Sequence, residues 1–220
     1  PSREMTRRQM LAALSTIPGA AALHFATDAH AQGGRAGRGA TFGGMAPDPQ
    51  VISDLVAANH ILVRKGIIQV QGHISVRHDR NPNRYFLARG ISPEIVTTAD
   101  IMEFDIDSSP MDQRGRNMFI ERFIHGEIYK ARPDANCVMH THTRAGTGVS
   151  VLRQGLRPIT QDALSVYDDL VYHEYGMPTS QEECDALGVT CQKGNSVVLR
   201  NHGLLTVGAT VPGALRRMYM

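Results

Sequence analysis

Short strand-like segments and helical segments follow one another in this chain without the regular strand–helix–strand repeat of a parallel sheet. From Asp48 to Met220, short apolar runs alternate with longer runs whose apolar residues recur at helical spacing. Parallel neighbours need a crossover connection, usually a helix, whereas antiparallel strands can be joined by short turns. The pattern therefore predicts an α/β fold, a sandwich of helices on a mostly antiparallel sheet.

Local signals place the individual elements. Asp48-Pro49 predicts a helix start, because a carboxylate caps the first turn and proline fits the first helical position. Residues 117–131 are the clearest helix, with apolar side chains on one side. The other predicted elements are a helix at 49–66, strands at 67–77 (broken at Gly72) and 85–88 that form a hairpin, a short helix at 97–100, strands at 101–105 and 137–142, a helix starting at 147, an irregular stretch at 155–180, a helix at 181–192, strands at 196–199 and 204–207, and a last helix after 210–212.

The N-terminal part of the chain has the features of an export signal. Arg7 and Arg8 precede a mildly apolar stretch, and Ala29-His30-Ala31 supplies small residues at the first and third positions of a cleavage site. We predict a twin-arginine-type signal peptide at 1–31 and a periplasmic mature protein. An ordinary N-terminal helix with two chance arginines is the alternative.

The predicted folded domain covers residues 46–220, after a glycine-rich linker at 32–45. The last helix would stop at Met220 with its apolar face half built, so we expect a C-terminal segment to be missing. A formal net charge of +2 and no block of Lys and Arg argue against a nucleic-acid partner. No apolar run is long enough to span a bilayer in the mature chain.

Three histidines form the candidate metal site. His140 and His142 lie two residues apart on a predicted strand, so their side chains point to the same side and can share one cation. His202 follows another predicted strand, in a loop with Gly203. Three histidines with an open fourth position are the ligand count of a catalytic zinc, although a pair of hydrogen-bonded histidines would also explain His140 and His142.

Glu121, His125 and Tyr129 form a polar stripe along the helix predicted at 117–131. A solvent-facing stripe is one interpretation. The helix also leads by a short turn into the strand of His140, so its N-terminal end can return to the metal. Glu121 is the stripe residue best placed to do so.

These motifs together resemble the class II aldolase/adducin family. The segment 121–142, Asn201-His202-Gly203, and the glycine motif at 72–77 carry the resemblance, which extends from about 50 to 220. It implies a three-layer α/β/α sandwich and a homotetramer with active sites at subunit interfaces. It also implies a Zn²⁺-type cation, alternatively Mn²⁺ or Co²⁺, on the three histidines, with Glu121 as the catalytic proton-transferring carboxylate.

Departures from the family's sugar-phosphate aldolases point to the substrate. Those enzymes have Asn at the position of His73, Thr or Ser at Arg89, and a Ser-Ser pair at Phe119-Ile120. A guanidinium binds a carboxylate by bidentate pairing, and Phe119 suits an aromatic ring. We therefore expect His73, Arg89 and Gly90 to bind a small carboxylic acid substrate.

The favoured function is a metal-dependent lyase that decarboxylates a hydroxy-aromatic acid, since the motifs look closest to the branch that decarboxylates hydroxylated aromatic or pyridine dicarboxylates. The first alternative is an aldolase for an unphosphorylated hydroxy-acid or sugar, and a sugar-phosphate aldolase or epimerase is less favoured. A non-catalytic interaction module of the adducin type is a further alternative. Loss of the histidines would indicate that module, and all three are present.

Overall fold

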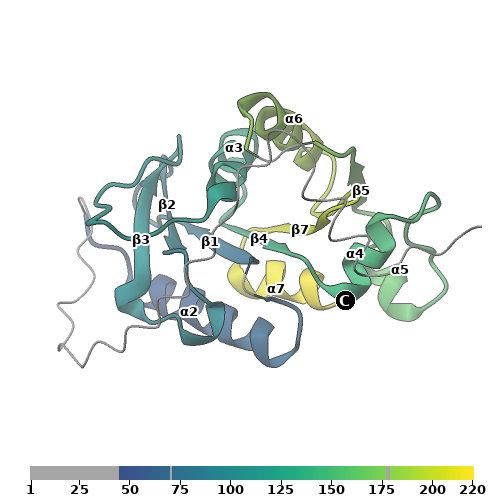
Figure 1. The fold of residues 1–220 in the computed structure, drawn as a ribbon, viewed down its shortest axis with the longest axis horizontal. Helices are drawn as coiled ribbons and strands as arrows, with labels where there is room; N and C mark the ends of the chain where they lie inside the picture. The colour runs from purple at the N-terminus through teal and green to yellow at the C-terminus, as the bar shows by residue number, and fades with distance from the viewer. Residues whose placement is uncertain (1–44, 70, 177–178) are drawn as a thin grey trace, which may run out of the picture. The chain divides into compact units, whose positions relative to one another are not determined.

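The structure is a computed structural model, and it describes residues 45–69, 71–176 and 179–220 (Figure 1). The predicted signal peptide at 1–31 and the predicted linker up to residue 44 lie outside the described residues. No helix in the described part of the chain is both long and apolar enough to cross a membrane.

A seven-stranded sheet forms the middle layer, with the strand order β3-β2-β1-β4-β7-β6-β5. The strands are β1 (His73–Arg77), β2 (Arg84–Ala88), β3 (Ile101–Asp105), β4 (Cys137–Thr141), β5 (Leu170–His173), β6 (Ser196–Leu199) and β7 (Gly203–Gly208). Every neighbouring pair is antiparallel except β5 with β6. The mostly antiparallel sheet is thus confirmed, with one parallel strand at its edge.

Helices cover both faces of this sheet (Figure 1). Helices α2 (Pro49–Arg64) and α7 (Val211–Tyr219) pack together on one face, and α3 (Phe123–Ala131) and α6 (Gln181–Cys191) pack together on the other. The remaining elements are α4 (Arg144–Ser150), which packs on β6 and β7, α5 (Gln161–Tyr167), and the 3₁₀ helices η1 (Pro93–Ile95), η2 (Thr98–Asp100) and η3 (Ile120–Arg122). The predicted three-layer α/β/α sandwich is confirmed.

Two apolar clusters, one on each face of the sheet, form the core. Strand β4 supplies both, because its side chains alternate: Val138 belongs to the cluster under α3 and α6, and Cys137 and Met139 belong to the cluster over α2 and α7. His140 is next in this alternation and therefore points to the same face as Val138. The α3 face is the one that carries the candidate site.

The helix predicted at 117–131 starts later than its periodicity indicates. Phe119 is extended (φ −64°, ψ 134°), a 3₁₀ turn follows, and the α-helix begins only at Phe123. The hydroxyl groups of Tyr85 and Ser108 both donate to the Arg122 carbonyl oxygen at 3.2 Å. These long-range contacts fix the turn in a way that local sequence cannot reveal.

Several other boundaries needed correction. The strand predicted at 67–77 forms only at β1, and the helix predicted from 147 begins at Arg144, because Thr143 caps it by accepting from Gly146 N. The stretch expected to be irregular contains α5 and β5. The helix start at Asp48 is confirmed, since its side chain accepts from Gln50 N at 2.8 Å, and so is the β1–β2 hairpin.

Candidate metal centre

Glu121, His140, His142 and His202 come together at one end of the sheet. One ligand atom from each of these four residues lies within 4.8 Å of the others. They come from η3, from the end of β4, from the segment directly after β4, and from the turn between β6 and β7. The four residues that the sequence proposed for metal and proton transfer thus form a possible metal site.

The tight connection between β6 and β7 brings His202 to the cluster. Leu199 pairs directly with Gly203, so the strand reverses within three residues, and Asn201 adopts a left-handed backbone (φ 57°) to allow this. A Cβ at Gly203 would collide with the Thr141 carbonyl oxygen. Glycine is therefore required where β7 starts beside the end of β4.

The hydrogen bonds of His140 determine which of its nitrogens can bind a cation. Its Nδ1 lies 3.0 Å from the Leu204 carbonyl oxygen, which can only accept, so Nδ1 carries the proton. Burial lowers the pKa of His140 to about 4, so the ring is neutral near pH 7. Nε2 therefore has a free lone pair, and the backbone carbonyl orients the ring in the way typical of metal-binding histidines.

This lone pair faces a second imidazole nitrogen and a carboxylate oxygen. The Nε2 atom of His140 lies 2.9 Å from His142 Nε2 and 3.2 Å from Glu121 Oε2, and Glu121 Oε1 lies 3.5 Å from His202 Nε2. Burial also lowers the pKa of His142 to about 4. The lone pair of His140 and the carboxylate of Glu121 repel each other unless a cation or a proton lies between them. The donor set therefore fits a divalent cation with nitrogen and oxygen ligands.

Glu121 is ionised in this environment. Burial acts to raise the pKa of its carboxyl group, but the contacts with His140, His202 and His73 outweigh burial, and the net pKa is lowered. Its Oε2 atom is buried and makes no well-oriented hydrogen bond. The carboxylate can therefore serve either as a base or as a further ligand.

His73, which the sequence analysis proposed for substrate binding, lies beside Glu121. It is the first residue of β1 and pairs across the sheet with His140. Its Nε2 atom lies 3.4 Å from Glu121 Oε2, and its ring centroid is 4.9 Å from that of Phe119. An imidazole and a phenyl ring thus border the carboxylate at the position proposed for substrate binding.

Arg89 and Gly90 have other partners in this structure. Arg89 follows β2, and its Nε donates to Asp100 Oδ1 at 2.7 Å. Gly90 N donates to the Asn117 carbonyl oxygen at 2.8 Å, close to the segment that leads to Glu121. The contacts of these two residues within the described part of the chain do not include the histidine cluster, so their role in substrate binding stays a prediction.

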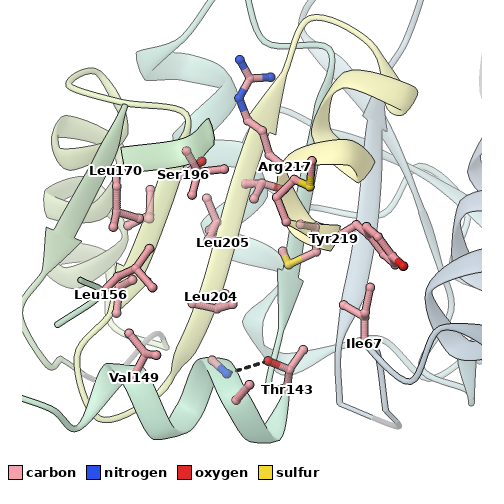
Figure 2. A pocket seen from close by; sticks show the side chains of 18 of the residues that line it. Ile67, Thr143, Val149, Leu156, Leu170, Ser196, Leu204, Leu205, Arg217 and Tyr219 are labelled. Atoms are coloured by element: carbon pink, nitrogen blue, oxygen red, sulfur yellow. Dashed lines mark hydrogen bonds between the residues drawn. The ribbon is translucent and has the colours of Figure 1, made fainter. Parts of the chain in front are cut away.

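Two cavities bear on the choice of site. A polar pocket of about 490 Å³ opens over the cluster and is lined by Glu121, His142, His202, Gln69, Gln71 and Asn201. A larger cavity of about 690 Å³ lies between α4 and α7, with walls that include Val149, Leu156 and Leu204 (Figure 2). None of the cluster histidines lines the larger cavity. The polar pocket is therefore the one that fits the chemistry.

Sequence reasoning missed the carboxamides at the mouth of the polar pocket. Gln69 and Gln71 precede β1, and Asn201 lies in the β6–β7 turn. For Asn201, its position in a loop at a strand end was the available signal, whereas Gln69 and Gln71 fell within the strand predicted at 67–77. Sequence reasoning also left open that the polar stripe might face solvent, whereas His125 and Tyr129 are at most 1% exposed and face β1.

Comparisons with known proteins agree with this geometry. A family model described as the class II aldolase and adducin N-terminal domain matches residues 53–220. Alpha-adducin of Mus musculus is 32% identical over 151 residues, which cover 66% of this chain and 20% of that protein. The decarboxylase tropJ of Talaromyces stipitatus is 27% identical over 187 residues, which cover 76% and 70% of the two chains. This chain therefore spans only about a fifth of the length of the adducin.

Among solved structures, L-fuculose 1-phosphate aldolase from Glaciozyma antarctica is similar in fold. The TM-score is 0.67 at 27% sequence identity, and the match covers 77% of this chain and 70% of the aldolase. The relatives thus include an adducin, a decarboxylase and an aldolase.

Proposed function

Because this chain belongs to the class II aldolase and adducin family, we propose that it is a divalent-metal-dependent lyase that breaks a carbon–carbon bond in a hydroxylated carboxylic acid. The convergence of three imidazoles and one carboxylate on a single point carries the proposal. The cation we propose is Zn²⁺, with Mn²⁺ or Co²⁺ as alternatives, because imidazole nitrogen suits such borderline cations.

The residues around the pocket divide the chemistry among them. A divalent cation held by His140, His142 and His202 would act as a Lewis acid toward substrate oxygens. Glu121, being ionised, takes a proton from the substrate hydroxyl group. When the bond to the carboxylate breaks and CO₂ leaves, the electron pair stays on carbon, and Glu121 returns its proton to that carbon. The substrate oxygen then regains a proton from water in the open pocket.

A hydroxy-aromatic acid is the substrate class that we propose. The phenyl ring of Phe119 and the imidazole of His73 lie together beside Glu121, and they offer an aromatic surface next to a hydrogen-bonding group. The similarity to a protein named a decarboxylase supports the same choice.

Two other activities are outcomes that the experiment must separate. Similarity to an L-fuculose 1-phosphate aldolase favours retro-aldol cleavage as the alternative chemistry. Similarity to an adducin favours an interaction module without catalysis. Both alternatives share the fold, so only the reaction at the pocket distinguishes them.

The test is a substrate screen on purified protein reloaded with Zn²⁺, Mn²⁺ or Co²⁺. We expect CO₂ release from at least one hydroxybenzoate or pyridine dicarboxylate. His202→Ala should lose both the metal and the activity. His60→Ala should keep both, because His60 hydrogen-bonds to the Val96 carbonyl oxygen, away from the cluster. A full complement of metal in His202→Ala, or aldol cleavage without any CO₂ release, would contradict the proposal.

Glu121→Gln separates proton transfer from metal binding in the same assay. The amide keeps the shape of the side chain but cannot carry the proton, so turnover should fall by about 10²–10⁴ with the metal still bound. Loss of metal from this variant would instead make Glu121 a ligand.

A further inference from the structure

Three carboxamide side chains line the polar pocket together with the metal cluster. The lining consists of three cluster residues, Glu121, His142 and His202, and three carboxamide residues, Gln69, Gln71 and Asn201. The carboxamide residues are exposed, and within the described part of the chain none of their side chains has a hydrogen-bond partner. Their amide groups are therefore available to a ligand that reaches the cluster.

The backbone holds two of these residues next to the cluster. Gln71 precedes Gly72, where an added Cβ would lie only 3.1 Å from the His140 carbonyl oxygen, so this segment packs closely on β4. Asn201 has a left-handed backbone (φ 57°), and its N donates to the Ser150 carbonyl oxygen at 3.2 Å. Because the backbone is already placed, binding a ligand here has to order only the side chains.

None of the described residues that line the pocket carries a positive charge. Arg89, which the sequence analysis proposed for carboxylate binding, is not among them, and its Nε donates to Asp100 instead. A divalent cation on the histidines would therefore be the positive centre of the pocket, and it can hold one substrate carboxylate. A second anionic group beside the carboxamides would leave water without a counter-ion, which is unfavourable.

The carboxamides themselves favour a neutral partner. Each offers a carbonyl oxygen that accepts and an NH₂ group that donates. A hydroxyl or amide group on the substrate can use both, whereas a carboxylate can only accept and is repelled by the carbonyl oxygens. The lining thus discriminates by charge.

We propose that Gln71 and Asn201, with Gln69, are specificity-determining residues that select a substrate whose group away from the metal is neutral and hydrogen-bonding. A hydroxyl or carboxamide substituent is favoured over a second carboxylate or a phosphate. This inference rests on the proposed function, and it narrows the hydroxy-aromatic acid to a monoacid with a neutral polar substituent.

The test is calorimetric titration of the Zn²⁺-loaded protein, with CO₂ release recorded in parallel. The probes are four salicylates that carry hydrogen, hydroxyl, carboxamide or carboxylate para to the phenol hydroxyl. We expect the hydroxyl and carboxamide probes to bind about threefold to tenfold more tightly than salicylate itself, and the carboxylate probe to bind more weakly than salicylate.

Carboxamide and carboxylate have the same shape, so the comparison of these two probes isolates charge. Binding of the carboxylate probe that is equal to or tighter than that of the carboxamide probe would overturn the proposal. So would a failure of all four probes to bind.

Gln71→Arg places a cation among the carboxamides, with Gln161→Arg as its charge-matched control. Gln161 is exposed at the start of α5 and does not line the pocket. We expect Gln71→Arg to bind the carboxylate probe more tightly than the carboxamide probe, while Gln161→Arg keeps the wild-type order. A folded, metal-loaded Gln71→Arg with the wild-type order would show that Gln71 does not contact the bound probe.

Asn201→Gly removes the second carboxamide but keeps the turn, because glycine adopts the left-handed backbone freely. We expect the metal content to be kept and the advantage of the hydroxyl and carboxamide probes over salicylate to fall by about threefold. An unchanged advantage would exclude Asn201 from recognition.

CO₂ release from the same probes separates this proposal from the proposed function. The expected order of affinities without any CO₂ release would contradict the lyase but leave the selection standing. CO₂ release with the carboxylate probe preferred would support the lyase and overturn the selection.

Discussion

At the scale of single residues, burial sets the protonation of the cluster. His140 lies in the core and His142 at the pocket, and burial lowers the pKa of both to about 4. Neutral imidazole is the form that binds a cation, so the fold prepares these ligands at neutral pH, mainly through burial.

The stability of the metal-free protein should therefore depend on pH. In the unfolded chain these histidines take up protons near pH 6.5, whereas in the folded chain they do so only near pH 4. Between these values the unfolded state binds more protons, so the free energy of unfolding should fall as the pH is lowered from about 6.5 to 4. Urea unfolding at pH 7, 5.5 and 4.5 measures this. A free energy that is constant or rises over this range would contradict the burial argument.

At the scale of elements, the packing of α3 against the Ile106–Ser108 loop determines where Glu121 lies. Gly126 of α3 is buried, and a Cβ there would collide with the Ile106 carbonyl oxygen and lie 2.6 Å from Ser108 Oγ. Ser108 also donates to the Arg122 carbonyl oxygen. The same contact thus seats the helix and closes the 3₁₀ turn that carries Glu121.

Gly126→Ala should destabilise the protein by about 1–3 kcal/mol, because the added methyl group has no space. It should also lower turnover, since displacement of α3 moves Glu121. Gly148→Ala is the control: Gly148 lies inside α4, is exposed, and has nothing within 4 Å of an added Cβ. That change should stabilise by roughly 0.5–1 kcal/mol. Thermal unfolding measures the change in stability of both variants. Equal changes for Gly126→Ala and Gly148→Ala would show that the helix has room for a methyl group at Gly126.

At the scale of the whole molecule, the cluster depends on three segments far apart in the chain. The sheet brings β4 beside β7, and α3 lies across the face to which His140 points. The predicted homotetramer with interface sites stays a prediction, as does export.

Export gives the last testable prediction. We expect the full chain, expressed with an initiator methionine, to reach the periplasm and to begin there at Gln32. Arg7→Lys combined with Arg8→Lys should leave it in the cytoplasm, because the twin-arginine route reads the paired arginines. Arg35→Lys with Arg38→Lys is the matched control in the linker and should be exported. Periplasmic protein whose N-terminal sequence still contains Arg7 would refute the cleavage site.

The sequence by itself determined the features that follow from neighbouring residues. The cap at Asp48 and the β1–β2 hairpin are local, because each depends on a few adjacent side chains and turns. Strand alternation placed His140 and His142 on one side of the predicted strand, and the loop with Gly203 indicated His202. These local rules, together with the family resemblance, were sufficient to name the cluster.

Only the tertiary structure decided the features that depend on distant partners. The helix predicted at 117–131 gives way to a 3₁₀ turn because Tyr85 and Ser108 hold the Arg122 carbonyl oxygen. His125 and Tyr129 of the polar stripe are buried because His125 lies against His73, 52 residues earlier in the chain, and Tyr129 lies against Ser75. Periodicity shows which side chains share a side of a helix, but it cannot show what covers that side. That is decided when the sheet and the helix pack together.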